Sequence, residues 1–117
     1  MCGIVGYIGD KDIASVLMVG LERLSYRGYD SAGIAVVSED EICIWKQPGK
    51  IHVLAKQLES KNIDANIGIG HTRWATHGIA NEVNAHPHAD AKSRFSIVHN
   101  GIIENYLSLK SDLINEG

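Results

Sequence analysis

The sequence has no excess of basic residues, no long hydrophobic run and no leader-like start. Its 117 residues include 11 Lys and Arg against 14 Asp and Glu, so the net charge is −3, and the basic stripe typical of nucleic-acid-binding proteins is missing. No stretch approaches the roughly 18–20 apolar residues of a membrane span, and the first residues lack the charged region and apolar core of a signal peptide. We therefore expect a folded cytoplasmic protein that binds neither nucleic acid nor membranes.

Cysteine is also scarce. The sequence contains two cysteines, Cys2 and Cys43, and because cytoplasmic thiols stay reduced, we expect no disulfide between them. Cys43 lies between two isoleucines in a strand-like run, so we interpret it as a small packed strand residue. Cys2 is different, because its position directly after the initiator methionine changes its chemistry.

Motifs for metal binding are missing as well. The six histidines, with His86-Pro87-His88 as the sharpest fragment, suggest a zinc hydrolase as one alternative, in which zinc-bound water attacks the substrate. The sequence contains neither a His-Glu-x-x-His motif nor a Cys-x-x-Cys pair. We therefore expect hydrogen-bonding roles for these histidines, no metal and no cofactor.

Glycine-bounded apolar runs and helical periodicity predict a mixture of strands and helices. Ile13, Leu17, Leu21 and Leu24 recur at three- and four-residue intervals ahead of Gly28, which is typical of an amphipathic helix with a glycine cap. Short connections favour antiparallel strand pairing in one α+β domain. The expected order is a strand at 3–9, a helix at 12–27, a hairpin of strands at 32–38 and 41–47, a helix at 51–60, strands at 66–73 and 94–100, and a helix at 103–116.

Cys2 becomes the N-terminal residue once Met1 is removed. It then carries a thiol and a free α-amine, whose reference pKa values of about 8.5 and about 7.7–8.0 make proton exchange between them inexpensive near neutrality. Such a residue supplies both nucleophile and base for acyl transfer, with the amine in place of the histidine of a triad. The alternative from position alone is a small apolar residue at the head of a strand.

Two further stretches follow predicted strands and offer polar groups for an amide substrate. The side chain of Asn100 and the N–H of Gly101 suit an oxyanion hole, although Asn-Gly is also the commonest hairpin turn. In "HTRWATHG", the Arg73 guanidinium suits a bidentate grip on a carboxylate, with Thr76 and His77 orienting the rest. A surface arginine beside a helix cap is the alternative there.

Five stretches, in order and in register, carry a family resemblance. They are "CGIVGYIG", "LSYRGYDSAGIAV", "GHTRWATHG", "NAHPH" and "VHNGIIENY". Over essentially its whole length the chain resembles the glutaminase domain of the glutamine–fructose-6-phosphate aminotransferase (isomerizing) family of class II glutamine amidotransferases. The stretches "TRWATHG" and "HNGIIEN" favour this family over the related phosphoribosyl-pyrophosphate amidotransferases and asparagine synthetases.

The resemblance implies an N-terminal-nucleophile hydrolase fold, a four-layer αββα sandwich, of which residues 1–117 are the N-terminal part. It implies that Cys2 forms a glutamyl thioester and that Asn100 and Gly101 make the oxyanion hole. The residues implied to bind glutamine are Arg73, Thr76 and His77. Supporting roles fall to Arg27 beside the N-terminus, His86 under the pocket loop, and Trp74 where ammonia leaves.

The family also implies what lies outside these residues. Ammonia would pass to fructose 6-phosphate in a sugar isomerase region and give glucosamine 6-phosphate, in a homo-oligomeric full-length protein. The rest of the glutaminase domain and the isomerase region are absent from the 117 residues. We therefore expect open sheet edges and uncovered apolar faces, and little glutamine hydrolysis by the isolated chain. A non-catalytic glutamine-sensing module is the alternative of another class.

Overall fold

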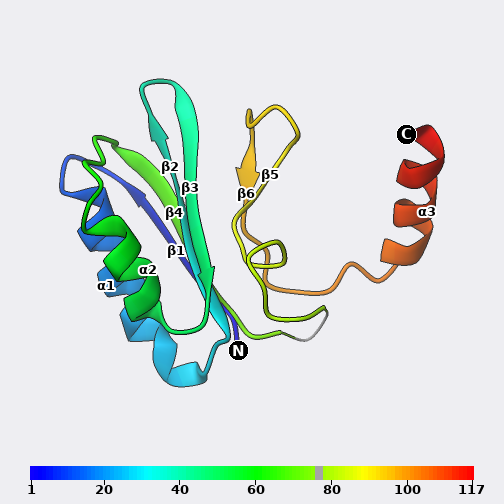
Figure 1. Cartoon of the computed structure of the whole chain (residues 1–117), viewed down its shortest axis with the longest axis horizontal. Helices are drawn as coiled ribbons and strands as arrows, with labels where there is room; N and C mark the ends of the chain where they lie inside the picture. Colours follow the sequence, from blue (N-terminus) through cyan, green and yellow to red (C-terminus); the bar gives the residue numbers. More distant parts are fainter. Residues whose placement is uncertain (76–77) are drawn as a thin grey trace.

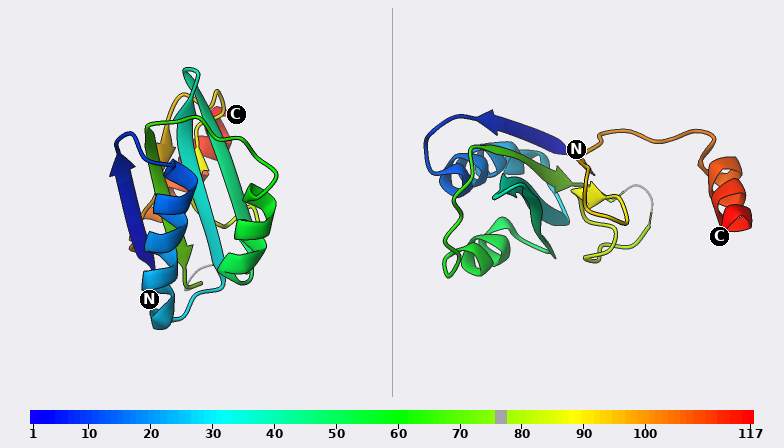
Figure 2. Two further views of the ribbon diagram at one scale, coloured as in Figure 1. Left: turned by 90° about the vertical axis from the view of Figure 1, so that its left-hand side faces the viewer. Right: turned by 90° about the horizontal axis from the view of Figure 1, so that it is seen from above.

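A four-stranded sheet with two helices on one face forms the body of the protein. The computed structural model describes residues 1–75 and 78–117. A two-stranded sheet lies on the other side of the main sheet, and the last helix lies beyond it (Figures 1 and 2). The elements are β1 (Gly3–Ile8), α1 (Ile13–Leu24), a 3₁₀ turn (Ser25–Arg27), β2 (Ser31–Ser38), β3 (Glu41–Pro48), α2 (Ile51–Leu58), β4 (Ile67–Arg73), β5 (His88–Ala89), β6 (Ser96–Ile97) and α3 (Tyr106–Glu116).

All strand pairs are antiparallel, as predicted. The main sheet has the order β1-β4-β2-β3, and β5 pairs with β6. The predicted hairpin is confirmed by the β2–β3 register, which runs from Ser31 opposite Pro48 to Ser38 opposite Glu41. In the main sheet, β1 and β3 are therefore the outer strands.

One face of the main sheet builds the hydrophobic core against α1 and α2. Ala32, Ile34 and Val36 alternate along β2 toward this face and pack with buried leucines of both helices. Glycines on the same face of β4 let α1 approach closely, because a Cβ on Gly68 would lie 2.9 Å from Cδ1 of Ile13. Cys43 packs against this core, which agrees with its interpretation as a packed strand residue.

The first helix begins and ends as its flanking residues dictate. The Asp12 carboxylate accepts a hydrogen bond from the Ser15 N–H at 3.2 Å, the usual N-cap arrangement. The last three residues predicted as α-helix, Ser25–Arg27, form a 3₁₀ turn instead. Gly28 then closes the turn with φ +79° and donates to the Ser25 carbonyl at 3.0 Å.

The C-terminal quarter differs most from expectation. The strand predicted at 94–100 is reduced to Ser96–Ile97, and the helix predicted from residue 103 begins at Tyr106. The reason lies in a contact between distant segments: the side chain of Asn100 hydrogen-bonds to β4 and to residue 2, which takes residues 98–100 away from strand pairing. No residue of α3 is buried.

Several apolar side chains on the second face of the sheet are exposed. Ile4 and Ile8 of β1, Val37 of β2 and Ile67 of β4 are 40–79% accessible.

Within the described residues, no helix has the length and apolar character needed to cross a membrane.

Candidate active site

The second face of the main sheet carries the polar residues of the site. A row across the four strands runs Ile4, His71, Gly33 and Lys46, and directly opposed residues point to the same face. The backbone of His86 lies over the glycine in this row, since a Cβ on Gly33 would come within 2.2 Å of the His86 carbonyl oxygen. The Lys46 ammonium fixes the same loop by donating to the carbonyls of Ala85 at 2.8 Å and Pro87 at 3.2 Å.

This close approach predicts a strong difference between two glycine substitutions in the sheet. Gly33→Ala is expected to displace the loop around His86 and to destabilise the protein by roughly 1–3 kcal/mol, the usual cost of overpacking. Gly6→Ala is the matched control, because no atom lies within 4 Å of its added Cβ. Urea denaturation of both variants tests this, and equal stabilities would contradict the packing described.

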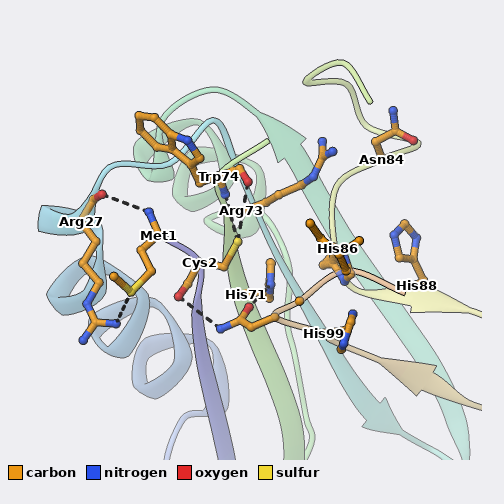
Figure 3. Close-up of a pocket in the computed structure, with 13 residues that line it drawn as sticks. Met1, Cys2, Arg27, His71, Arg73, Trp74, Asn84, His86, His88 and His99 are labelled. Atoms are coloured by element: carbon orange, nitrogen blue, oxygen red, sulfur yellow. Dashed lines mark hydrogen bonds between the residues drawn. The ribbon is translucent and has the colours of Figure 1, made fainter. Parts of the chain in front are cut away.

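A cavity of about 610 Å³ opens beside this row, at the end of the sheet where β1 begins and β4 ends (Figure 3). Its wall combines the N-terminus, the end of β4, the loop around His86 and the segment after β6. The lining residues are Met1, Cys2, Arg27, His71, Arg73, Trp74, Asn84, His86, His88, His99, Asn100, Gly101 and Ile102.

Cys2 lies at this cavity, directly before β1. The pairing of β1 with β4 holds its position, and the Gly3 N–H donates to the buried Thr72 hydroxyl at 3.0 Å. The Cys2 Sγ accepts a hydrogen bond from the Trp74 N–H at 3.2 Å. The thiol also donates to the Trp74 carbonyl at 3.8 Å, so two contacts with the Trp74 backbone hold the sulfur at the cavity.

The 3₁₀ turn holds the amino terminus. The Met1 ammonium donates to the carbonyls of Arg27 at 3.2 Å and Gly28 at 3.5 Å, and the Arg27 guanidinium donates to the Met1 sulfur at 3.5 Å. The Trp74 ring packs against the opposite side of Gly28, where a Cβ would lie 2.5 Å from Cζ3. Met1 itself is 69% exposed and is therefore accessible to a processing aminopeptidase.

Asn100 bridges the N-terminal strand and β4. Its Nδ2 donates to the Cys2 carbonyl at 3.2 Å, and its Oδ1 lies 2.8 Å from Nε2 of His71. Gly101 follows at the cavity wall with φ +152°. The two residues predicted to form the oxyanion hole thus lie beside the predicted nucleophile, although Asn100 is 98 positions from it in sequence.

Arg73, the last residue of β4, is 7% exposed and lines the same cavity. Its guanidinium donates to the carbonyls of Ile79 at 3.2 Å and Gly78 at 3.3 Å, so the following loop folds back over it. Thr76 and His77, predicted to share its substrate role, lie outside the described residues.

Three histidine rings lie next to one another, tilted, in the lining of the cavity. The His86 ring lies 4.4 Å from that of His71 and 4.3 Å from that of His88, measured between centroids. Burial, followed by the positive charges of neighbouring groups, lowers the pKa of His86 from 6.5 to about 4. Burial likewise lowers the pKa values of His71 and His88. All three imidazoles are therefore neutral at pH 7.

These shifts predict a loss of stability in mild acid. Between about pH 6.5 and pH 4 an unfolded chain protonates His86, whereas the folded chain does not. The contribution of neutral His86 to the free energy of unfolding is therefore fully present above pH 6.5 and is lost as the pH approaches 4. His86→Gln removes one such group and is expected to show a smaller decline. Denaturation at pH 7.5, 5.5 and 4.5 measures this, and parallel declines in both proteins would contradict the assignment.

The structure adds residues that lie within the quoted stretches but have no assigned role in the sequence analysis. His71 contacts Asn100, Asn84 lines the cavity, and the Asp30 carboxylate accepts a hydrogen bond from the Ala75 N–H. Asp30 also pairs its own N–H with the Arg73 carbonyl at 2.7 Å. Of these residues, only His71 has a sequence signal: the alternation of side chains along its strand indicates which face of the sheet its side chain points to. Among the described residues, no group of three or more His, Cys, Asp or Glu side chains forms a metal site.

The chain is similar in sequence to curated proteins that share one name. The chain is 56% identical over all 117 residues to the glutamine–fructose-6-phosphate aminotransferase [isomerizing] of Pyrococcus horikoshii, of which it covers 20%. It is 54% identical over 114 residues, 97% of its length, to the enzyme of that name from Staphylococcus aureus and covers 19% of it. The chain thus spans about a fifth of these curated relatives and matches their N-terminal part. No family model matches the chain.

A solved structure shares the fold. The glutamine phosphoribosylpyrophosphate amidotransferase from B. subtilis, complexed with ADP and GMP, superimposes with a TM-score of 0.80 at 26% identity. The alignment covers 100% of this chain and 25% of that protein. The α+β fold is therefore that of an N-terminal-nucleophile amidotransferase, and the chain matches a quarter of the length of that solved protein.

Proposed function

We propose that this chain, like the proteins it matches in sequence, belongs to a glutamine–fructose-6-phosphate aminotransferase (isomerizing) and forms the N-terminal portion of its glutaminase domain. The observation that carries the proposal is the convergence of Cys2, Asn100 and Arg73 on one cavity. These three side chains are what an amide hydrolase needs for attack, for oxyanion stabilisation and for holding a carboxylate.

The first step is activation of Cys2 by removal of Met1. This removal exposes an α-amine with a reference pKa of about 7.7–8.0, which accepts the thiol proton at neutral pH. The carbonyls of Arg27 and Gly28, which hold the present amino terminus, remain beside it as hydrogen-bond acceptors. Arg27 is thus a supporting residue for the new N-terminus.

The reaction is acyl transfer through a thioester. The Cys2 Sγ attacks the side-chain amide carbon of L-glutamine, and the Asn100 amide and Gly101 N–H stabilise the oxyanion that forms. The carbon–nitrogen bond then breaks, and the protonated amine of Cys2 gives its proton to the leaving ammonia. Water attacks the glutamyl thioester, which releases glutamate and the free thiol.

Substrate recognition is assigned to the end of β4. In this proposal the buried Arg73 guanidinium binds the glutamine α-carboxylate, and Thr76 and His77 are the further residues assigned to glutamine binding. His86 supports the loop that closes this side of the cavity, through its backbone contact with Gly33. Trp74, which is 50% exposed, lies where ammonia leaves.

The fate of ammonia follows from the names of the relatives. We propose that it reacts with fructose 6-phosphate in the isomerase region of a cytoplasmic, homo-oligomeric full-length protein, giving glucosamine 6-phosphate without a cofactor. The identity of 54–56% to enzymes of this name, against 26% to the phosphoribosylpyrophosphate enzyme, favours this substrate.

Labelling with a glutamine-like electrophile tests the proposal. We expect 6-diazo-5-oxo-L-norleucine to modify the full-length protein once, on Cys2, with loss of ammonia release and with protection by glutamine. The alternative, a glutamine-sensing module, predicts saturable glutamine binding that survives Cys2→Ala, and no ammonia release from the intact protein. That second result would exclude the enzymatic proposal.

A further inference from the structure

A buried histidine contacts the side chain that the proposed mechanism assigns to the oxyanion. His71 lies on β4 and is 0% exposed. Its Nε2 lies 2.8 Å from Oδ1 of Asn100, whereas its Nδ1 is buried and has no hydrogen-bond partner within the described part of the chain. Nε2 is therefore the ring nitrogen that makes hydrogen bonds, and its side-chain partner is Asn100.

The contacts at both ends of the Asn100 side chain fix which way its amide faces. The Cys2 carbonyl, an acceptor, lies 3.2 Å from one end, so that end must be the NH₂ group. The other end is then the carbonyl oxygen, which only accepts hydrogen bonds. His71 must therefore donate through an Nε2–H. A flipped amide would place two acceptors together at Cys2.

The electrostatic environment of His71 agrees with this tautomer. Burial lowers the pKa of His71 more than its hydrogen bonds to Asn100 and to the His99 backbone raise it, so the ring is neutral at pH 7. A neutral imidazole carries one proton. With that proton on Nε2, the bare Nδ1 is the nitrogen left without a partner, as observed.

This arrangement leaves one defined donor. An asparagine NH₂ group has two N–H bonds, and the Cys2 carbonyl uses one of them. His71 anchors the oxygen of the Asn100 amide and Cys2 anchors its nitrogen, so rotation about the side-chain bonds of Asn100 is blocked. The second N–H is then available at the part of the cavity wall that Asn100 forms. Without His71, Asn100 would be an exposed loop side chain held at one end.

We propose that His71 is a positioning residue, which holds the Asn100 amide in the orientation that donates to the reacting carbonyl of the substrate. The inference rests on the proposed glutaminase function. It assigns His71 no proton transfer and no contact with substrate. Its effect on the reaction passes through Asn100 alone.

Kinetics of two variants of the full-length protein test the proposal. His71→Leu removes the donor and is expected to lower kcat roughly 10-fold or more, as a displaced catalytic group does, with the KM for glutamine within about threefold of the wild type. His71→Gln keeps an Nε2–H donor at similar reach and is expected to recover most of the lost kcat. His52→Leu, on the exposed face of α2, is the matched control and should retain wild-type kinetics.

A double-mutant cycle separates positioning from a general structural role. In an Asn100→Ala background, His71→Leu should lower kcat less than about twofold, because its partner is already gone. A loss in that background as large as in the wild type would overturn the proposal. So would a His71→Gln variant as impaired as His71→Leu while thermal unfolding shows both to be folded.

The tautomer can be measured without any activity, in the 117-residue chain labelled with ¹⁵N-histidine. At pH 7.5 we expect His71 to show a protonated Nε2 and an unprotonated Nδ1, and Asn100→Ala to perturb the Nε2 signal. A proton on Nδ1 would overturn the inference. If the tautomer is as expected but the intact protein releases no ammonia, the proposed function fails, whereas the contact between His71 and Asn100 stands.

Discussion

Replacing Cys2 by alanine is expected to lower kcat for glutamine hydrolysis by on the order of 10⁴-fold or more, since the covalent route through a thioester is lost. The fold should survive, because Cys2 precedes β1 and is only partly buried. Glutamine binding should survive too, as Arg73 is untouched. Ammonia release and glutamine binding, measured side by side on the full-length protein, give both results.

The second cysteine provides the matched control. Cys43 lies on β3 and packs against the hydrophobic core, so Cys43→Ala should keep its activity and lose about 1 kcal/mol of stability through the missing sulfur contacts. If Cys2→Ala retained glutaminase activity, or if Cys43→Ala abolished it in a folded protein, the assignment of the nucleophile would be wrong.

Asn100→Ala is expected to lower kcat about 10²–10³-fold, the usual effect of removing one oxyanion donor. The KM for glutamine should change little, because the ground-state amide needs this donor less than the transition state does. Asn100→Asp keeps the shape of the side chain but replaces the donor by a charged acceptor, and should be at least as impaired.

The two variants also separate catalysis from binding. Labelling of Cys2 by iodoacetamide should proceed in both, since alkylation of the thiol forms no oxyanion on the reagent. A rise in KM with unchanged kcat would show instead that Asn100 contributes to ground-state binding, and would contradict the oxyanion assignment.

Local patterns in the sequence predicted most of the body of the fold. Apolar residues at helical spacing predicted α1, and the expected glycine cap, Gly28, closes the 3₁₀ turn that follows it. The two strand-like runs at 32–38 and 41–47 predicted the β2–β3 hairpin. These features depend on neighbours in sequence. The shortened β6 could not be predicted in this way, because the side chain of Asn100 is committed to contacts with β4 and residue 2.

The site was predictable to a similar extent. Cys2, Arg73, Asn100 and Gly101 could be singled out by chemistry and by family resemblance, and the structure places them at one cavity. Their roles remain predictions. The sequence could not show which histidine meets Asn100, because His71 reaches it only through the register of β4 against β1 and β2. The packing of His86 on Gly33 likewise depends on segments that only the folded sheet brings together.

The central claim is that Cys2, as the N-terminal residue, forms a covalent bond to the substrate. Acid quenching of the full-length protein during turnover with glutamine, followed by mass spectrometry of the N-terminal peptide, tests it directly. We predict a peptide that begins at Cys2 and carries one glutamyl group on its thiol. An active protein that retains Met1, or a glutamyl group on any other residue, would contradict this account.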